Sequence, residues 1–265
     1  MPEKDVYAVS AGAKYRLQVL RDFRKFREFA LSDNGWTREL SSTHIVVDTQ
    51  SQGCDGCNKL KVVRVRREMP QVSCEDLYDT LHDSTYRKTW DDNMIEGYNI
   101  AVLNRHNDIG YYAVKLPWPM KNRDFCNMRS WMEFTNGEYI IFNHSVPHKD
   151  CPPNKSFVRA KSILTGYLIR PLGSGGCVLN YITHSDPCGS IPHSIINMVV
   201  TRVVPSVMSQ LQKCSLNYRV FFEKTYKVSR AELPWRTPKM NWDSANNFPE
   251  DDIDTEKGEG EVDGR

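Results

Sequence analysis

Long apolar runs are absent from this sequence of 265 residues, and so is a leader-like start. No stretch reaches the roughly 18 apolar residues that are needed to cross a bilayer. The first 15 residues, MPEKDVYAVSAGAKY, lack the continuous apolar core of a secretory signal. We therefore expect a cytoplasmic protein whose eight cysteines are reduced, and we interpret the sequons at Asn143 and Asn154 as chance matches.

Enzyme motifs are equally scarce. The sequence has no GxSxG, no GxGxxG after a predicted strand, no P-loop and no HExxH. His82 and Asp83 are adjacent, and adjacent residues cannot easily orient one another as two members of a catalytic triad. We therefore predict that the protein is not an enzyme and uses no cofactor.

Metal-ligand spacing is limited to CDGC, residues 54–57. His44 is close in sequence, but no second CxxC or HxxxH completes a ligand set. Asp55-Gly56 is itself a hairpin turn signal. We interpret the motif as a turn and expect no metal site; the alternative is a metal or redox pair.

The two signs of charge are unevenly divided between the C-terminal tail and the rest of the chain. Residues 246–265 contain eight acidic and two basic residues, which give this tail a net charge of −6. Because the whole chain has a net charge of +2, residues 1–245 carry a net charge of +8. Such a tail is expected to be disordered, and such a body to be attracted to an anionic surface. The basic residues are scattered and no aromatic stacking motif accompanies them, which favours an anionic membrane over nucleic acid.

Apolar periodicity predicts one helix followed by strands. Residues 15–31 repeat apolar groups at helical spacing, whereas residues 43–49 and 59–68 alternate as strands do. Ser73 and Asp76 resemble a capping box and begin a short helical insertion. In the strand at residues 59–68, three basic side chains are expected mostly to face water: Lys61, Arg64 and Arg66. We interpret them as a solvated face of the strand; the alternative is a specific binding patch.

Turn signals then predict successive hairpins at residues 106–108, 136–137 and 173–176. From Ile191 to Leu211 apolar residues recur every four positions, and Pro205 is expected to kink this helix. The stripe is typical of a helix packed on a sheet, with membrane insertion as the alternative.

The predicted fold class is α+β, with an antiparallel sheet between an N-terminal and a C-terminal helix. We expect a flexible N-terminus (1–14), one domain (15–226), an irregular extension (227–245) and an acidic disordered tail (246–265). A curved sheet closed by a helix can enclose either a core or a cavity, and periodicity does not distinguish them.

A charged pair stands at helical spacing in YRKTWD. Arg87 and Asp91 are four residues apart, the spacing at which a guanidinium and a carboxylate meet on one helical face. On the surface such a pair has little energetic weight. In a cavity, Asp91 would fix the Arg87 fork and leave guanidinium donors for a phosphate. Spacing alone favours the surface pair.

Residues 116–131, LPWPMKNRDFCNMRSW, place Trp118 between two prolines. Neither proline offers a donor to a strand ladder, so residues 117–119 are expected to form an exposed loop between two strands. Trp118 either folds back onto its own domain or anchors in the headgroup region of a bilayer.

Four segments together resemble the START family of lipid-transfer domains in their order and spacing: LYDTLHDSTYRKTWD, PWPMKNRDF with RSW, VRAKSILTGYLI, and DPCGSIPHSIIN. The resemblance extends from roughly Trp36 to Lys224. Within the family, the sequence is most similar to the phosphatidylcholine-transfer branch, and especially resembles the member that carries phosphatidylcholine and phosphatidylethanolamine. It implies a helix-grip fold, in which a curved antiparallel sheet wraps around a C-terminal helix and an internal lipid tunnel.

The resemblance also implies roles for individual residues. Arg87 and Asp91 would lie beside the lipid phosphate, which reverses the preference for a surface pair. The positions of an aromatic choline cage fall on Tyr112, Phe125 and Ile163, so the cage is incomplete and should also accept ethanolamine. Other residues are implied in the headgroup cavity (Asn127, Thr165), in the lid and membrane contact (Pro117, Trp118, Pro119, Met120, Ile195, Val199, Val203), and in a structural pair (Arg123 with Asp124).

The function implied is transfer of phosphatidylcholine and phosphatidylethanolamine between membranes, with one phospholipid bound per monomer and transient contact with an anionic membrane. A lipid-gated sensing or interaction module, in which bound lipid is a signal rather than cargo, is the alternative that the acidic tail suggests.

Overall fold

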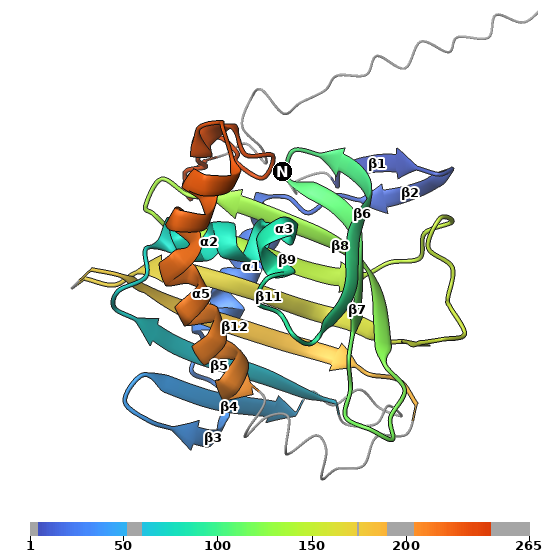
Figure 1. The fold of residues 1–265 in the computed structure, drawn as a ribbon, viewed down its shortest axis with the longest axis horizontal. Helices are drawn as coiled ribbons and strands as arrows, with labels where there is room; N and C mark the ends of the chain where they lie inside the picture. The colour runs from blue at the N-terminus through green and yellow to red at the C-terminus, as the bar shows by residue number, and fades with distance from the viewer. Residues whose placement is uncertain (1–4, 52–59, 174, 190–203, 245–265) are drawn as a thin grey trace, which may run out of the picture.

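The computed structural model describes residues 5–51, 60–173, 175–189 and 204–244. Within these ranges one curved sheet of ten strands dominates the molecule, in the order β3-β4-β5-β12-β11-β9-β8-β7-β6, with β10 paired to β8 (Figure 1). Its strands are β3 (Thr37–Ser41), β4 (Ile45–Ser51), β5 (Lys61–Met69), β6 (Met94–Asn104), β7 (Asn107–Val114), β8 (Arg123–Glu133), β9 (Tyr139–Ser145), β10 (Val158–Arg159), β11 (Lys161–Pro171) and β12 (Cys177–Asp186).

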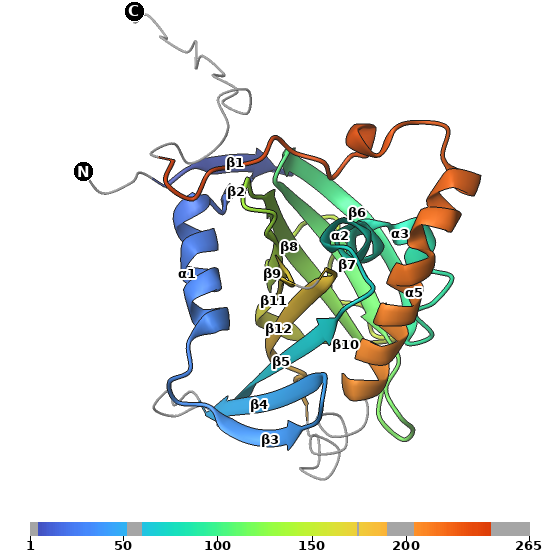
Figure 2. The same cartoon turned by 90° about the vertical axis from the view of Figure 1, so that its left-hand side faces the viewer.

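Helices cover both faces of the sheet. Helix α1 (Leu20–Leu31) lies on one face, and α2 (Cys74–His82), α3 (Ser84–Arg87) and α5 (Val204–Thr225) lie on the other, as Figure 2 shows. We call these the α1 face and the α5 face. The predicted α+β class is confirmed, because an antiparallel sheet and a long C-terminal helix make up the domain.

Each face has its own apolar core. Phe23 of α1 meets Phe142 of β9 edge-on and Phe26 stacks on it, with ring centroids 4.8 and 5.4 Å apart. A Cβ at Gly166 would lie 2.6 Å from both Phe26 and Phe142, so the absence of a side chain there lets α1 approach the sheet. On the α5 face, Leu211, Tyr218 and Phe222 of α5 are buried in the second core.

The predicted hairpins are present, with one shift. Gly137 adopts φ +81° in the turn between β8 and β9, as a tight turn of this kind requires. β11 and β12 form the hairpin predicted around residues 173–176. The turn between β6 and β7 occupies residues 105–106, because Asn104 pairs with Asn107, rather than the predicted 106–108.

The N-terminal helix begins later than its periodicity predicted. Residues 15 and 16 belong to β2 (Ala13–Arg16), which pairs with β1 (Tyr7–Ser10), and α1 starts at Leu20. The Asp22 carboxylate accepts hydrogen bonds from the Val19 amide (3.0 Å) and from Arg16 (3.0 Å), which satisfies the helix start at this point. This hairpin lies largely within residues 1–14, which were expected to be a flexible N-terminus.

One basic side chain of β5 was wrongly expected to face water. Lys61 and Arg66 are exposed, but Arg64 is only 8% exposed. It pairs with Asp48 at 2.8 Å and lies 4.3 Å from the Trp36 ring centroid. The reason is local: Ser32 at the end of α1 and the Trp36 ring contact Arg64, whereas Arg66 on the same side of β5 stays exposed.

The extension after α5 runs from the α5 side of the molecule back toward α1 (Figure 2). It contains a short 3-10 helix (Arg230–Glu232), and at its end Trp242 stacks on Phe134 with centroids 3.6 Å apart. Arg24 of α1 donates to the Trp242 carbonyl at 2.7 Å. The extension therefore bridges both layers. The acidic tail and the CDGC motif lie outside the described residues.

His82 is half-buried where the extension crosses α2, and its Nε2 atom is enclosed. Its ring stacks on Trp235 at 5.8 Å and meets Tyr78 and Trp131 edge-on at 4.5 and 5.3 Å. Burial first, and then Arg129 and Arg236, hold the pKa of His82 well below 6.5. The imidazole is therefore neutral in the folded protein, whereas in the unfolded chain it takes up a proton as the pH falls through about 6.5.

We expect His82 to make the folded state less stable in acid. Below pH 6.5 only the unfolded state binds this proton, so stability falls by up to about 1.4 kcal/mol per pH unit until the folded pKa is reached. Urea unfolding of His82→Phe should show a loss between pH 7 and pH 5.5 that is about 1 kcal/mol smaller than in the parent protein. His44→Gln, at an exposed histidine, is the control. Equal losses in all three proteins would contradict this assignment.

Candidate functional site

The buried carboxylate of Asp83 fixes the short helix that carries the candidate site. Its Oδ1 accepts hydrogen bonds from the Thr85 and Tyr86 amides, both at 2.9 Å. Its Oδ2 accepts hydrogen bonds from the hydroxyls of Tyr218 and Tyr226, both at 3.1 Å. The Asp83 side chain thus caps α3 and also links α3 to Tyr218 of α5 and to Tyr226, which directly follows α5. This linkage places Arg87, the last residue of α3, on the α5 face.

Arg87 and Asp91 meet as their spacing predicted. Arg87 Nε donates to Asp91 Oδ2 at 2.9 Å, and the Tyr112 hydroxyl of β7 donates to the same oxygen at 3.1 Å. The Asp91 side chain is 9% exposed and that of Arg87 is 27% exposed. The Arg87 guanidinium also lies 5.0 Å from the Tyr112 ring centroid. A third side chain and partial burial distinguish this arrangement from an exposed surface pair.

The electrostatics keep Arg87 charged. Burial acts to lower the pKa of Arg87, but Tyr112, Tyr167 and Asp91 outweigh it and leave the pKa above its usual value. Burial raises the pKa of Tyr112, and Arg87 only partly offsets this. Asp91 is engaged through Nε alone, so this carboxylate does not use the two terminal nitrogens of the guanidinium. Such a fork is suited to bidentate contact with a phosphate.

Two further tyrosines extend the site across the sheet. Tyr167 of β11 and Tyr181 of β12 are paired across the strands, with ring centroids 5.0 Å apart. Burial raises the pKa of both hydroxyls. Both belong to the core on the α5 face, so they line the same side of the sheet as Tyr112 and Arg87.

A row of small polar side chains continues the site along β8, β9, β11 and β12. Thr165 Oγ1 lies 3.1 Å from Thr183 Oγ1 and 3.3 Å from Ser185 Oγ. Asn127 donates to Asn143 at 3.0 Å and accepts from Ser145 at 2.8 Å. We call these residues the polar row. Hydroxyls and amides that already bond one another can reorient toward a polar ligand at modest cost.

The structure brings most of the predicted headgroup residues onto neighbouring strands. Tyr112 and Phe125 are directly opposite one another on β7 and β8, and both are half-buried. Asn127 and Thr165 belong to the polar row. Ile163 instead occupies an irregularity in the pairing of β11 with β12 and is 48% exposed. Two of the three predicted cage positions are therefore adjacent aromatics, and the third is open to solvent.

The predicted pair between Arg123 and Asp124 does not form. Arg123 donates to the carbonyls of Pro187 and Cys188, each at 2.8 Å, whereas Asp124 pairs with Arg159 at 2.9 Å. Consecutive residues of a strand point to opposite faces of the sheet, so these two side chains cannot meet. Both residues stabilise the start of β8, but through different partners. Arg123 hydrogen-bonds the loop after β12, and Asp124 pairs with Arg159 of β10.

The Pro-Trp-Pro loop is exposed as predicted. Trp118 is 92% exposed, with exposed Pro117 and Pro119 on either side and Met120 half-buried. The Met120 amide closes a turn on the Pro117 carbonyl at 3.1 Å. Trp118 therefore does not fold back onto its own domain. The other predicted membrane-contact residues, Ile195, Val199 and Val203, lie outside the described residues, as does all of the predicted helix before Val204.

A cavity of about 450 Å³ opens next to the charged pair, between the segment after α3 and β6, and its lining includes Lys88, Asp91, Met94 and Tyr98. In the part of the chain that the structure covers, no set of three or more His, Cys, Asp or Glu side chains is placed to hold a metal ion. No helix among the described ranges is both long and apolar enough to cross a bilayer.

Comparison with known proteins identifies the family. The START domain family model matches residues 20–219. The chain is 38% identical to START domain-containing protein 10 of Homo sapiens over 221 residues, which are 83% of this chain and 74% of that protein. The chain belongs to the START domain family. It is 28% identical to phosphatidylcholine transfer protein of Bos taurus, over 79% of this chain and 97% of that protein.

The crystal structure of human STARD10 matches the START fold described above, with a TM-score of 0.74 at 38% identity, over 83% of this chain and 89% of that chain. The predicted family, its phosphatidylcholine-transfer branch and its curved antiparallel sheet with a C-terminal helix are therefore confirmed. START domains are a lipid-transfer family, and neither of these two relatives is named as an enzyme.

Sequence reasoning missed part of the polar lining of the START domain. Tyr167, Tyr181 and Thr183 were not singled out, although the signal was present. In TGY (165–167) and YIT (181–183), polar residues recur at every second position of predicted strands, which places them on one face. The Tyr112 hydroxyl bond to Asp91 had no local signal, because 21 residues separate the two.

Proposed function

We propose that this START domain binds one phospholipid on the α5 face of its sheet and carries it between membranes in the cytoplasm. The observation that supports this most directly is the arrangement of Arg87, Asp91 and Tyr112. It offers a fixed guanidinium, with terminal nitrogens that Asp91 does not use, beside half-buried tyrosines and the polar row. In this proposal the phosphate contacts Arg87, and the acyl chains occupy a tunnel between the sheet and the C-terminal helix.

The proposed cargo is phosphatidylcholine together with phosphatidylethanolamine. Tyr112 and Phe125 offer two aromatic rings to a headgroup cation, while Ile163 is exposed and supplies no ring. An aromatic box that is open on one side favours a quaternary ammonium less strongly than a complete one. The name of one relative, phosphatidylcholine transfer protein, supports the same class of ligand.

The lipid must be carried inside the protein because exposing its acyl chains to water costs too much free energy. A diacyl lipid with about 30 methylenes would cost on the order of 24 kcal/mol to strip into water, at about 0.8 kcal/mol per methylene. The lipid must therefore pass directly from the bilayer into the domain while the domain is docked. No bond is made or broken in this step, so we propose a carrier and not an enzyme.

Lipid analysis tests this function directly. The purified protein is incubated with vesicles of mixed phosphatidylcholine, phosphatidylethanolamine, phosphatidylserine and phosphatidylinositol, separated by gel filtration, and extracted for mass spectrometry. We expect phosphatidylcholine and phosphatidylethanolamine to be enriched over the vesicle composition, at about one lipid per protein. Recovery without enrichment of either lipid would contradict the proposed cargo.

Transfer between vesicles distinguishes a carrier from a lipid-gated module. Trp118, 92% exposed on a turn between two prolines, is the proposed bilayer anchor. We expect Trp118→Ala to slow the transfer of fluorescent phosphatidylcholine several-fold while the lipid content of the purified protein stays unchanged. Val102→Ala, at a residue 73% exposed on β6, is the matched control. If the parent protein binds lipid but does not transfer it, the module is the correct description.

A further inference from the structure

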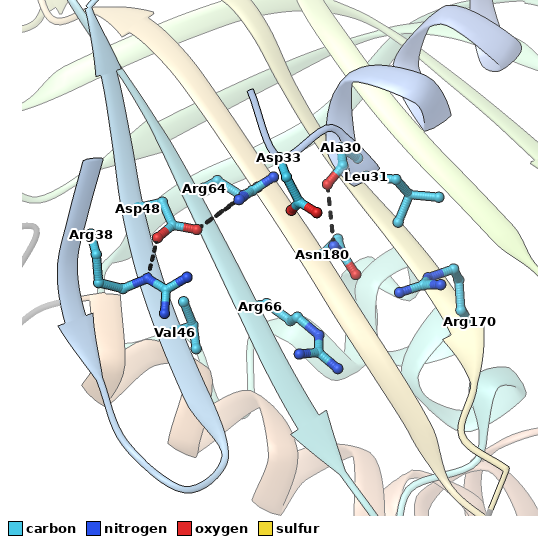
Figure 3. Close-up of a pocket in the computed structure, with 10 residues that line it drawn as sticks. All are labelled: Ala30, Leu31, Asp33, Arg38, Val46, Asp48, Arg64, Arg66, Arg170 and Asn180. Atoms are coloured by element: carbon cyan, nitrogen blue, oxygen red, sulfur yellow. Dashed lines mark hydrogen bonds and ion pairs between the residues drawn. The ribbon is translucent and has the colours of Figure 1, made fainter. Parts of the chain in front are cut away.

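A second cavity lies on the opposite face of the sheet from the proposed lipid site. Its volume is about 270 Å³, and it opens between the end of α1 and strands β3, β4, β5, β12 and β11 (Figure 3). The lining residues are Ala30, Leu31, Asp33, Arg38, Val46, Asp48, Arg64, Arg66, Arg170 and Asn180. Four arginines and two carboxylates therefore surround one space.

Two of these arginines share one carboxylate, so one positive charge of this trio is left over. Asp48 is 3% exposed, and it receives Arg38 Nε on one carboxylate oxygen at 2.6 Å and Arg64 Nη2 on the other at 2.8 Å. Arg64 also donates to the Ser32 carbonyl at the end of α1. Asp48, Arg38 and Arg64 thus form one wall with a net charge of +1, and the other charges of the cavity come from Arg66, Arg170 and Asp33.

Arg170 and Asn180 each present a buried polar atom with no partner among the residues that the structure describes. These atoms are Arg170 Nε, a donor, and Asn180 Oδ1, an acceptor. Asn180 is 4% exposed, and its orientation is set because Nδ2 donates to the Ala30 carbonyl at 3.3 Å. Figure 3 shows the Asn180 oxygen and the guanidinium groups of Arg66 and Arg170 directed into the same space.

The Arg170 side chain is held in an unfavourable setting. Burial lowers the pKa of Arg170, and the neighbouring Arg27 and Arg66 add to this effect, while Glu138 opposes it. Of the ion pairs found among the described residues, none involves Arg170. Arg170 is half-buried, and its Nε is enclosed without a hydrogen-bond partner among the described residues. An enclosed donor that is left unpaired is costly, and departures of this kind are typical of binding sites.

We propose that this cavity binds a small phosphate monoester that also carries hydroxyl groups. The guanidinium groups of Arg66 and Arg170 match the oxygens of a phosphate. The orphan Oδ1 of Asn180 and the carboxylate of Asp33 can only accept hydrogen bonds, and ligand hydroxyls would satisfy them. The volume equals that of about nine water molecules at about 30 Å³ each, which suits a polyol phosphate of the size of glycerol 3-phosphate.

The site is separate from the proposed lipid site. Asn180 and Arg64 point to the α1 face, whereas the neighbouring Tyr181 and Val65 belong to the core on the α5 face. Alternation along β12 and β5 therefore places the two sites on opposite sides of one sheet. Loss of ligand here should leave lipid occupancy unchanged, which makes failure of this inference distinguishable from failure of the lipid-carrier proposal.

Calorimetric titration tests the site, with glycerol 3-phosphate as the soluble probe and glycerol as the uncharged control. We expect the parent protein to bind glycerol 3-phosphate and not glycerol. Arg170→Gln should weaken binding at least tenfold and Arg66→Gln should weaken it to a smaller extent, because Arg66 also pairs with Glu68 at 2.9 Å. Arg219→Gln, at an exposed arginine on α5, should change nothing.

A vesicle-binding experiment determines whether the phosphate belongs to a lipid headgroup or to a soluble metabolite. Flotation with vesicles that contain phosphatidylinositol 4-phosphate is compared with vesicles that contain phosphatidylinositol. Binding to the former alone, lost in Arg170→Gln, would support the site with a lipid headgroup as its ligand; binding of the soluble probe would support a free metabolite. The proposal is overturned if neither probe binds, or if both bind equally to the parent protein and to Arg170→Gln with unchanged circular dichroism.

Discussion

Arg87→Glu is expected to leave the protein folded but without bound phospholipid. The substitution places a second carboxylate beside Asp91, which is 9% exposed, and removes the guanidinium proposed to contact the lipid phosphate. Truncation of one partner in a buried charge pair costs about 2–5 kcal/mol. This range corresponds to roughly a 30-fold to several-thousand-fold loss of affinity.

The measurement is phospholipid recovered per mole of purified protein, with vesicle transfer as the second readout. Arg219→Glu is the matched control, because it makes the same change at an arginine whose side chain is 75% exposed on α5. Tyr112→Phe is expected to have a smaller effect, since it removes one hydroxyl bond to Asp91 and keeps the ring and the charges. Normal lipid occupancy in folded Arg87→Glu would eliminate the phosphate role of Arg87.

Asp79→Ala is expected to destabilise the fold far more than the loss of an exposed ion pair does. Asp79 on α2 is fully buried, and its carboxylate accepts hydrogen bonds from Trp235 Nε1 (2.8 Å), Arg236 Nη2 (2.7 Å) and Arg230 Nε (2.9 Å). All three donors belong to the extension after α5. Without the carboxylate, two guanidinium groups lose their shared buried anion at a cost of about 3–5 kcal/mol.

Thermal and urea unfolding measure this loss. For a chain of this size we expect Tm to fall by roughly 6–20 °C. Cleavage by a protease within residues 227–244 should also become faster, because the extension loses its attachment to α2. Glu223→Ala, which breaks the exposed pair with Arg219, should change stability by less than about 0.5 kcal/mol. A change of similar size in both variants would mean that the Asp79 network contributes no more than a surface pair.

Contacts between residues that are close in sequence could be predicted from the sequence, as three examples show. The capping role of Ser73, whose Oγ accepts the Asp76 amide at 3.0 Å, and the turn at Gly137 follow from residues that are neighbours in sequence. The i,i+4 contact of Arg87 with Asp91 is local in the same sense. These features were predicted because the interacting groups and the backbone geometry that joins them lie within one turn.

Arg64 and Arg123 show where local reasoning fails. Arg64 was expected in water and is buried, and Arg123 was expected to bind its neighbour but instead binds carbonyls more than 60 residues away. In both cases the answer depends on which strands and helices lie beside the residue. Strand periodicity assigns a side chain to a face of the sheet, but it does not say what covers that face.

The START family, the α+β class, most of the turns and the charged pair at Arg87 and Asp91 could all be predicted from the chain alone, because they depend on motif order, short-range spacing and backbone preference. The three-dimensional packing was needed to show that Tyr112 completes this pair, that Tyr167 and Tyr181 lie on the same face, and that Arg170 and Asn180 share a second cavity across the sheet. These relations join residues on strands that are distant in the chain. Alternation within one strand, as in TGY and YIT, assigns a side chain to a face, but the packing of the whole sheet decides which strands lie side by side and which residues therefore meet.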